Sequence, residues 1–411
     1  MTVARVGILG AGTMGRGIAQ VAALGGYETR LYDAYPEAAE GAAVKLREAL
    51  AKGAFRGRWS DAEADAASNR IGPALGIGEL AGCELLIEAA PESLELKRKL
   101  FTEVAEVCGP ETILASNTSS LRVSDIAIGV PNPERLVGMH FFNPPVLMKL
   151  VEVVAAKKSS ERALRTTTEV AVAMGRTPIR AKDTPGFVAN RLARPFALES
   201  LRILGDGLVD AAKVDRVVRL GGGFRMGPFE LIDLIGLDVN LTIARSFFAQ
   251  GGGLERWRPS PIQERLVEEG KLGRKSGEGY YAYAEDSGSA VPLHRNAQED
   301  SATVGPTLDP IALAEIDPAA TEILSRLFAQ IANETAFALE EGIASAEDMD
   351  TAMRLGLNWP LGPFGLAEKI GAAAAVELLE KLEREKGAAY AQAPLLRRAA
   401  EQGVELRNVE R

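Results

Sequence analysis

Hydrophobic and polar positions follow two different patterns along this chain. Up to about residue 184, short apolar runs alternate with segments of helical periodicity, which is typical of a parallel sheet built from βαβ units. The predicted strands are residues 3–9, 29–32, 85–89, 113–115, 136–140 and 150–154. The predicted helices include residues 14–24, 36–55 and 93–107. The pattern therefore predicts an α/β domain over residues 1–184.

The pattern changes at the segment Asp183-Thr184-Pro185-Gly186. Helical periodicity then dominates to about residue 279, and a second helical block follows Pro318. Between them, the polar residues 285–310 are interrupted by serine, glycine and proline, which indicates a linker. We expect helical domains at residues 185–284 and 318–411, joined by a linker over residues 285–317.

The two helical blocks match each other when one is shifted by 135 positions. Matched glycines and a matched Gly-Pro-Phe in one register are difficult to attribute to chance between two alanine- and leucine-rich segments. The matches include Glu199 with Glu334, Gly207 with Gly342, Asp215 with Asp350, and Gly227-Pro228-Phe229 with Gly362-Pro363-Phe364. The second helical domain is therefore predicted to be a degenerate repeat of the first.

Composition excludes several classes of protein. A chain of 411 residues is expected to hold two or three domains at about 150 residues each. No apolar run approaches the ~18 residues of a membrane-spanning helix, and the N-terminus lacks the features of a signal peptide. A net charge of −9 argues against a general nucleic-acid binder. Two cysteines provide neither a disulfide framework nor a cysteine-based metal site, so we expect a cytoplasmic protein without a bound metal.

The run Gly10-Ala11-Gly12-Thr13-Met14-Gly15 follows a predicted strand and opens a predicted helix, which is the context of a dinucleotide-binding loop. Gly10 permits a tight turn, Gly12 lets the backbone approach a pyrophosphate, and Gly15 lets the helix pack closely on the strand. Amide groups at the helix N-terminus then face the phosphates. Taken alone, the motif also fits a glycine-rich turn without a ligand.

Asp33 ends the second predicted strand, where a carboxylate accepts hydrogen bonds from ribose hydroxyls. That carboxylate would repel the 2′-phosphate of NADP, and Tyr35 rather than an arginine follows it. FAD proteins use the same motif but need more chain to hold the flavin than the first domain provides. The predicted cofactor is therefore NAD.

His140 ends a predicted strand, and Glu152 lies within the next apolar run. Ligands bind at the carboxyl edge of open α/β sheets, and a buried carboxylate needs a partner. An imidazole held by a carboxylate removes the hydroxyl proton in an alcohol dehydrogenation. Taken singly, His140 also fits a satisfied core histidine, and Glu152 also fits a charge on an edge strand.

Two further polar positions are candidates for contact with a substrate oxygen. Ser119 lies in the polar run after the strand at residues 113–115, and Asn190 lies on the first helix of the second domain. A helix N-cap and a solvent-facing helix residue are the ordinary alternatives for these two.

Taken together, these residues resemble the L-3-hydroxyacyl-CoA dehydrogenases, NAD-dependent enzymes of fatty-acid β-oxidation and butyrate-type metabolism. The resemblance covers nearly the whole chain and rests on residues 10–15, 88–92, 116–120, 140–152, 183–191 and 273–281. It implies a Rossmann-type NAD-binding domain followed by all-α domains like the C-terminal region of 6-phosphogluconate dehydrogenases. It also implies oxidation of (S)-3-hydroxyacyl-CoA by NAD⁺ to 3-oxoacyl-CoA and NADH.

The resemblance also implies roles for individual residues. His140 would be the catalytic base and Glu152 would orient it, while Ser119 and Asn190 would hold the hydroxyl and thioester region of the substrate. Glu92 and Lys97 would border the nicotinamide. For the anionic CoA, the basic residues Lys52, Arg56 and Arg58 at the end of a predicted helix are our candidates, although a solvated helix end explains them equally well.

Two departures from the family pattern are visible. The order of proline and valine in residues 140–148 differs from the commoner one, which affects the acyl pocket but leaves the base intact. The repeat also places Ser325 opposite Asn190, so the second helical copy lacks the family's polar group. We expect that copy to be structural and to pack on the first within the chain as a pseudo-dimer, an arrangement compatible with a higher oligomer.

Two other functions remain open at this point. One is an NAD-dependent dehydrogenase of a free 3-hydroxy acid or sugar acid, which would need a cationic clamp for a carboxylate. The other is a non-catalytic NAD-binding structural protein, as among lens crystallins. The presence of Ser119, His140, Glu152 and Asn190 together argues against the second.

Overall fold

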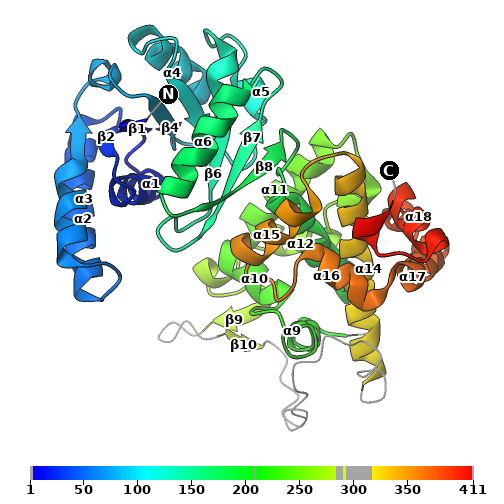
Figure 1. Ribbon diagram of the computed structural model, residues 1–411. Helices are drawn as coiled ribbons and strands as arrows, with labels where there is room; N and C mark the ends of the chain where they lie inside the picture. Colours follow the sequence, from blue (N-terminus) through cyan, green and yellow to red (C-terminus); the bar gives the residue numbers. More distant parts are fainter. Residues whose placement is uncertain (1–2, 208, 284–289, 293–316, 410–411) are drawn as a thin grey trace. The chain divides into compact units, whose positions relative to one another are not determined.

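The structure is a computed structural model that describes residues 3–207, 209–283, 290–292 and 317–409 (Figure 1). The chain divides into two compact units, Met1–Val188 and Ala189–Arg411. The first unit is an α/β domain and the second is almost entirely helical. Most of the predicted linker, including His294, lies outside the described residues.

One eight-stranded sheet forms the centre of the first unit, in the order β3-β2-β1-β4-β5-β6-β7-β8. The strands are β1 (Arg5–Leu9), β2 (Glu28–Tyr32), β3 (Ile71–Ala74), β4 (Leu85–Glu88), β5 (Ile113–Ser116), β6 (Leu136–Phe141), β7 (Leu150–Ala155) and β8 (Thr177–Lys182). Apolar side chains such as Ile8 and Ile87 on these strands are completely buried. The chain leaves β1 toward β2 on one side, and β4 lies on the other side of β1. This reversal of strand order is where α/β sheets bind ligands.

The predicted parallel sheet is correct from β3 to β6 and wrong at β7, which runs antiparallel to β6. The connection between β6 and β7 is too short for a parallel crossover, which needs a dozen or more residues. The antiparallel register places His140 directly opposite Glu152. The topology thus brings together the two side chains that the sequence singled out.

Helices cover the sheet, namely α1 (Thr13–Leu24), α2 (Pro36–Phe55), α3 (Asp61–Arg70), α4 (Leu94–Val107), α5 (Val123–Ile126) and α6 (Glu161–Ala173). Three of them (α3, α5 and α6), with the strands β3 and β8, were absent from the predicted elements. The helix α3 buries only Ala64 and Ala67, so its apolar periodicity is too weak to predict a helix. Its start is instead marked by a capping box formed by Ser60 and Glu63. The strand β3 contains Pro73 and lies at the sheet edge, where a proline is tolerated.

The second unit contains two series of helices. The first series is α7 (Ala189–Leu192), α8 (Arg194–Gly205), α9 (Ala211–Leu220), α10 (Pro228–Ile235), α11 (Leu237–Gln250) and α12 (Pro261–Glu268). The second series is α14 (Pro318–Glu340), α15 (Ala346–Gly356), α16 (Pro363–Ile370), α17 (Ala372–Lys386) and α18 (Pro394–Gln402). A two-stranded hairpin of β9 (Tyr281–Tyr283) and β10 (Ala290–Pro292) follows the first series, and β10 falls within the predicted linker.

The sequence repeat corresponds to repeated structure. A shift of 135 residues carries the starts of α9, α10 and α11 onto the starts of α15, α16 and α17. In the first series, the Asp215 carboxylate accepts from the amide of Phe229 at 2.9 Å. In the second, Asp350 accepts from the amide of Phe364 at 3.0 Å. The same packing contact is therefore built twice.

Buried ion pairs join the two series. Arg191 and Arg326, which the shift relates, are almost fully buried, and each contacts two carboxylates of the other series. The partners are themselves related by the same shift, so the contacts are reciprocal. The closest N–O distances are 2.7 Å for Arg191 to Glu334 and to Glu341, 2.7 Å for Arg326 to Glu199, and 2.6 Å for Arg326 to Asp206.

Candidate active site

The glycine-rich loop between β1 and α1 has the geometry that dinucleotide binding requires. Gly10 has a φ of +109°, in the region that favours glycine, and a Cβ atom on it would lie 2.7 Å from the Ala89 carbonyl oxygen. A Cβ atom on Gly15 would lie 1.8 Å from the Gly10 carbonyl oxygen, so only glycine lets α1 start this close to β1. Beside Gly12 there is open space within 4 Å, into which a phosphate fits.

A cavity of about 700 Å³ lies at the carboxyl ends of β1, β2 and β4. Its lining includes Gly10, Gly12, Thr13, Met14 and Asp33. The Asp33 carboxylate accepts from the amide of Ala11 at 2.8 Å and from the amide of Tyr35 at 3.1 Å, so it also braces the glycine loop. The volume, the glycine loop and the acidic rim fit NAD.

His140 and Glu152 form a buried pair at the same end of the sheet. The Nδ1 atom of His140 lies 2.7 Å from an oxygen of Glu152. An ionised carboxylate only accepts hydrogen bonds, so this contact assigns the proton of a neutral imidazole to Nδ1. The other Glu152 oxygen accepts from the Val188 amide at 3.0 Å. The pair is thus fixed from both sides of the carboxylate, with Nε2 left as a lone-pair acceptor.

Aromatic rings surround the His140 imidazole. The ring of Phe142 lies 4.6 Å from it and the ring of Phe187 lies 5.9 Å away, measured between centroids. The amide of the next residue, Phe141, donates to the Asn117 side chain at 2.8 Å and fixes the end of β6 to the loop after β5. No residue in the described part of the chain hydrogen-bonds Nε2, which therefore stays available to a ligand.

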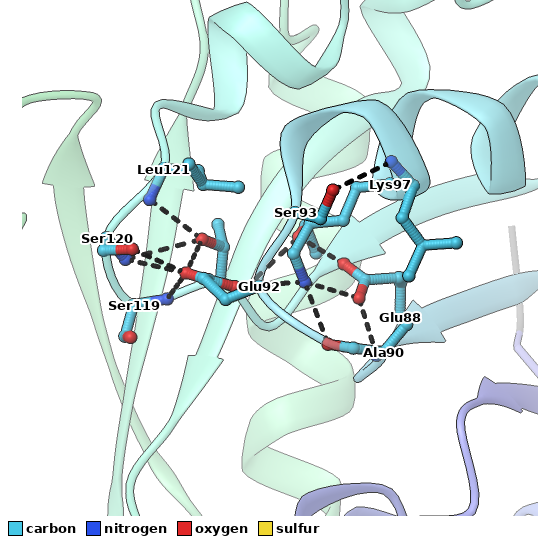
Figure 2. A network of polar contacts seen from close by, with 11 residues as sticks. Glu88, Ala90, Glu92, Ser93, Lys97, Ser119, Ser120 and Leu121 are labelled. Atoms are coloured by element: carbon cyan, nitrogen blue, oxygen red, sulfur yellow. Dashed lines mark hydrogen bonds and ion pairs between the residues drawn. The ribbon is translucent and has the colours of Figure 1, made fainter.

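A second buried pair, Lys97 with Glu88, lies at the end of β4 (Figure 2). Their N–O distance is 2.6 Å, and both side chains are almost completely shielded from solvent. Glu88 also accepts from the Ala90 amide at 2.7 Å and from the Ser116 hydroxyl at 2.6 Å. A buried charge pair is tolerated when such hydrogen bonds satisfy its remaining oxygens. This network links β4, α4 and the end of β5.

Glu92 connects that network to the polar loop after β5. It lies 3.2 Å from Lys97 and accepts from the Thr118 hydroxyl at 2.5 Å and from the Ser119 amide at 3.1 Å. Burial would raise the pKa of Glu92, but the charge of Lys97 and the hydroxyl hydrogen bonds outweigh it and hold the pKa below its ordinary value. Figure 2 shows that the Ser119 hydroxyl points away from this carboxylate. That hydroxyl is exposed and has no partner among the described residues.

Comparison with known proteins gives a consistent assignment. The family model described as "3-hydroxyacyl-CoA dehydrogenase, NAD binding domain" matches residues 5–184. The model described as "3-hydroxyacyl-CoA dehydrogenase, C-terminal domain" matches twice, at residues 186–283 and 323–409. The chain belongs to the 3-hydroxyacyl-CoA dehydrogenase family. It is an NAD-dependent oxidoreductase.

Several relatives extend over most or all of the chain. A 3-hydroxyadipyl-CoA dehydrogenase of Escherichia coli K12 is 35% identical, over 97% of this chain and 98% of the relative. A 3-hydroxybutyryl-CoA dehydrogenase of Bradyrhizobium diazoefficiens is 36% identical over 68% of this chain and 96% of its own length. The crystal structure of a 3-hydroxybutyryl-CoA dehydrogenase from Escherichia coli K12 has a TM-score of 0.85 and 34% identity, covering 98% of this chain and 99% of that one.

The remaining predicted residues of this family member lie in several places. Asn190 is on α7, in the helical unit, where its carbonyl accepts from Arg194 at 3.2 Å. Lys52 and Arg56 lie exposed at the C-terminal end of α2, outside the lining of the 700 Å³ cavity. Lys97 is buried between two carboxylates, so it shapes the site through Glu88 and Glu92.

Glu88, Ser116 and Asn117 belong to the site but were not singled out from the sequence. Glu88 ends an apolar strand, the same signal that marked Glu152, and Lys97 follows on the next helix.

None of the described helices has the length and apolarity required to span a membrane. Likewise, the described residues contain no group of three or more histidine, cysteine, aspartate or glutamate side chains suited to a metal ion.

Proposed function

We propose that the enzyme oxidises (S)-3-hydroxyacyl-CoA to 3-oxoacyl-CoA and reverses the reaction, with His140 as general base and acid. The observation that carries this proposal is the 2.7 Å contact between Nδ1 of His140 and Glu152, which leaves Nε2 free among the described residues. NAD⁺, when bound, accepts the hydride from the carbon that carries the hydroxyl group.

The route of the substrate proton follows from the hydrogen bonds of His140. Nε2 takes the proton of the substrate hydroxyl, and the imidazolium that forms keeps its Nδ1 proton against Glu152. The carboxylate stabilises this cation and holds the ring in one orientation. In the reverse direction, the imidazolium returns the proton to the 3-oxo oxygen. The rings of Phe142 and Phe187 lie beside the imidazole, which is buried.

We assign Ser119 and Asn190 to substrate binding, at the hydroxyl and thioester region. The exposed Ser119 hydroxyl, and the family resemblance of both positions, support the assignment. Gly10, Gly12 and Gly15 would bind the pyrophosphate of NAD together with Thr13 and Met14, and Asp33 would bind the ribose. Glu92 and Lys97 would form the wall beside the nicotinamide. Lys52 and Arg56 are our candidates for CoA.

The acyl chain is the open part of this assignment. The names of two relatives point to different chains, because 3-hydroxyadipyl-CoA carries a carboxylate at its far end and 3-hydroxybutyryl-CoA ends in a methyl group. Both chains are candidates for this enzyme.

We also propose that the chain contains an NAD-binding domain over residues 1–184 and two helical copies, residues 185–284 and 318–411, that form a pseudo-dimer. The two matches of one family model and the reciprocal contacts of Arg191 and Arg326 support this division. Sedimentation of the full chain should show no dimer assembled through the first helical copy. A dimer assembled that way, with the second copy detached, would contradict the pseudo-dimer.

The substrate proposal is tested by NADH oxidation with acetoacetyl-CoA and with free acetoacetate at equal concentrations. The proposed enzyme turns over the thioester and leaves the free acid almost unchanged. Preference for the free acid would favour the free 3-hydroxy acid alternative. Turnover of neither compound, with NADH bound, would contradict acetoacetyl-CoA as a substrate.

A further inference from the structure

Three arginines are buried among the described residues of the helical unit, and they differ in their partners. Arg191 and Arg326 each contact two carboxylates of the other helical series. Arg194 contacts none in the same described set, although it too is almost fully buried. A buried cation without a carboxylate is costly, so Arg194 requires an explanation that the other two do not.

The contacts of Arg194 leave most of its guanidinium unused. Its Nε donates to the Asn190 carbonyl at 3.2 Å, and the guanidinium carbon lies 5.4 Å from the centre of the Phe247 ring. Its Nη1 is buried without any partner in the described residues. Burial lowers the pKa of Arg194 to about 10, which reflects how little in the surroundings compensates its charge.

A buried arginine with a purely structural role has different contacts in this protein. Arg135 in the first unit is buried without a carboxylate, but its Nη1 donates to the carbonyls of Gly109 and Thr112 and only its Nε is left unpaired. In Arg194 the situation is reversed, because Nε is bonded and the terminal Nη1 is not. The unpaired atom of Arg194 thus lies at the terminal end of the guanidinium, which is the end that pairs with a carboxylate in fork-like contacts.

Arg194 lies next to a residue that we have assigned to the substrate. It follows Asn190 by four residues and bonds that residue's carbonyl, and Asn190 is already assigned to the thioester region. A shift of 135 residues places Ser325 opposite Asn190 and Ala329 opposite Arg194. The second helical copy therefore lacks both polar groups together, while it retains the buried arginine that joins the copies.

We propose that Arg194 binds a carboxylate at the far end of the acyl chain, so that the preferred substrate is the 3-hydroxyacyl-CoA of a dicarboxylic acid. The guanidinium fork presents parallel N–H groups that match a carboxylate in a bidentate pair. A terminal methyl group would instead leave Nη1 buried and unsatisfied. This inference rests on the proposed function and selects between the two acyl classes left open there.

The test compares two thioesters of equal chain length, 3-oxoadipyl-CoA and 3-oxohexanoyl-CoA, which differ only in a terminal carboxylate or methyl group. The wild-type enzyme should have the higher kcat/KM with 3-oxoadipyl-CoA. Arg194→Leu should lower that value by about 10- to 100-fold, as expected for a charge-assisted hydrogen bond, and should change kcat/KM for 3-oxohexanoyl-CoA little. Arg194→Lys, which keeps the charge, should retain part of the preference.

Arg219→Leu is the matched control, because Arg219 is an exposed arginine of the same unit paired only loosely with Glu230, at 3.6 Å. It should leave the ratio of the two substrates unchanged. NADH affinity and the thermal unfolding temperature identify an Arg194 variant that has lost its fold. If Arg194→Leu does so, the comparison of the two thioesters with Arg194→Lys tests the proposal. A wild-type preference for 3-oxohexanoyl-CoA overturns the proposed role of Arg194 but leaves the proposed function intact. An equal loss with both thioesters in Arg194→Leu or Arg194→Lys has the same consequence. No wild-type turnover of either thioester overturns the proposed function as well.

Discussion

The two helical copies of the second unit share a framework and differ in their polar side chains. Both build the same contact between an aspartate and the start of a helix, at Asp215 and at Asp350. Only the first copy has Asn190 and Arg194. Features needed for packing occur twice, whereas features assigned to the substrate occur once. The comparison therefore separates what the fold requires from what the reaction requires.

The course of the backbone differs at the same place. In the first copy the helix is interrupted at Ala193, between α7 and α8, whereas α14 of the second copy continues without a break. Pro195 in the first copy corresponds to Gln330 in the second. A proline lacks an amide hydrogen and clashes with the carbonyl of the preceding turn, which explains the interruption. At this break, the Asn190 carbonyl accepts a hydrogen bond from the side chain of Arg194.

The largest effect is expected where the copies are most alike. Arg191→Met and Arg326→Met should each lower the free energy of unfolding by about 3–5 kcal/mol, because each removes the main partner of a buried glutamate of the other copy, Glu334 or Glu199. Urea denaturation followed by circular dichroism measures both losses. A large loss for one variant with none for the other would show that the reciprocal contacts are not equivalent.

A smaller effect is expected where the copies differ. Asn190→Ala should lower kcat/KM for a 3-oxoacyl-CoA by about 10- to 100-fold, the value of one or two hydrogen bonds to the substrate. Ser325→Ala, at the corresponding position of the second copy, should leave kcat/KM unchanged. Equal losses in steady-state NADH oxidation would mean that the second copy takes part in the reaction.

The smallest effect concerns a glycine found in both copies. A Cβ atom on Gly227 would lie 2.3 Å from the Asp215 carboxyl carbon, and one on Gly362 would lie 2.0 Å from a carboxylate oxygen of Asp350. Gly227→Ala and Gly362→Ala should therefore each destabilise the protein by about 1–3 kcal/mol, the usual cost of overpacking. Thermal unfolding measures this loss of stability. An unchanged midpoint in either variant would show that the glycine is not equally required in the two copies.

Much of the first unit could be predicted from the sequence, because its signals are local. The glycine loop, the strand before it and Asp33 lie within one continuous segment, and His140 and Glu152 both interrupt apolar runs. The direction of β7 was also within reach, since the short connection after β6 excludes a parallel crossover.

Other features depend on contacts between distant residues. The Lys97 pair with Glu88 needs the strand order that brings β5 beside β4, which supplies Ser116. The partners of Arg191 lie more than a hundred residues away, in the other helical copy. The isolation of Arg194 is visible only once its neighbours are known, because an arginine on a helix is ordinarily exposed.

The central claim is that the His140 imidazole, held by Glu152, transfers the substrate proton. His140→Gln is the most direct test, because glutamine keeps a polar side chain at that position but cannot take up a proton. The kcat for NADH oxidation by a 3-oxoacyl-CoA should fall by about 10²- to 10⁴-fold, with NADH affinity and the unfolding midpoint unchanged. A variant that binds NADH normally and keeps the wild-type kcat would contradict the assignment of His140.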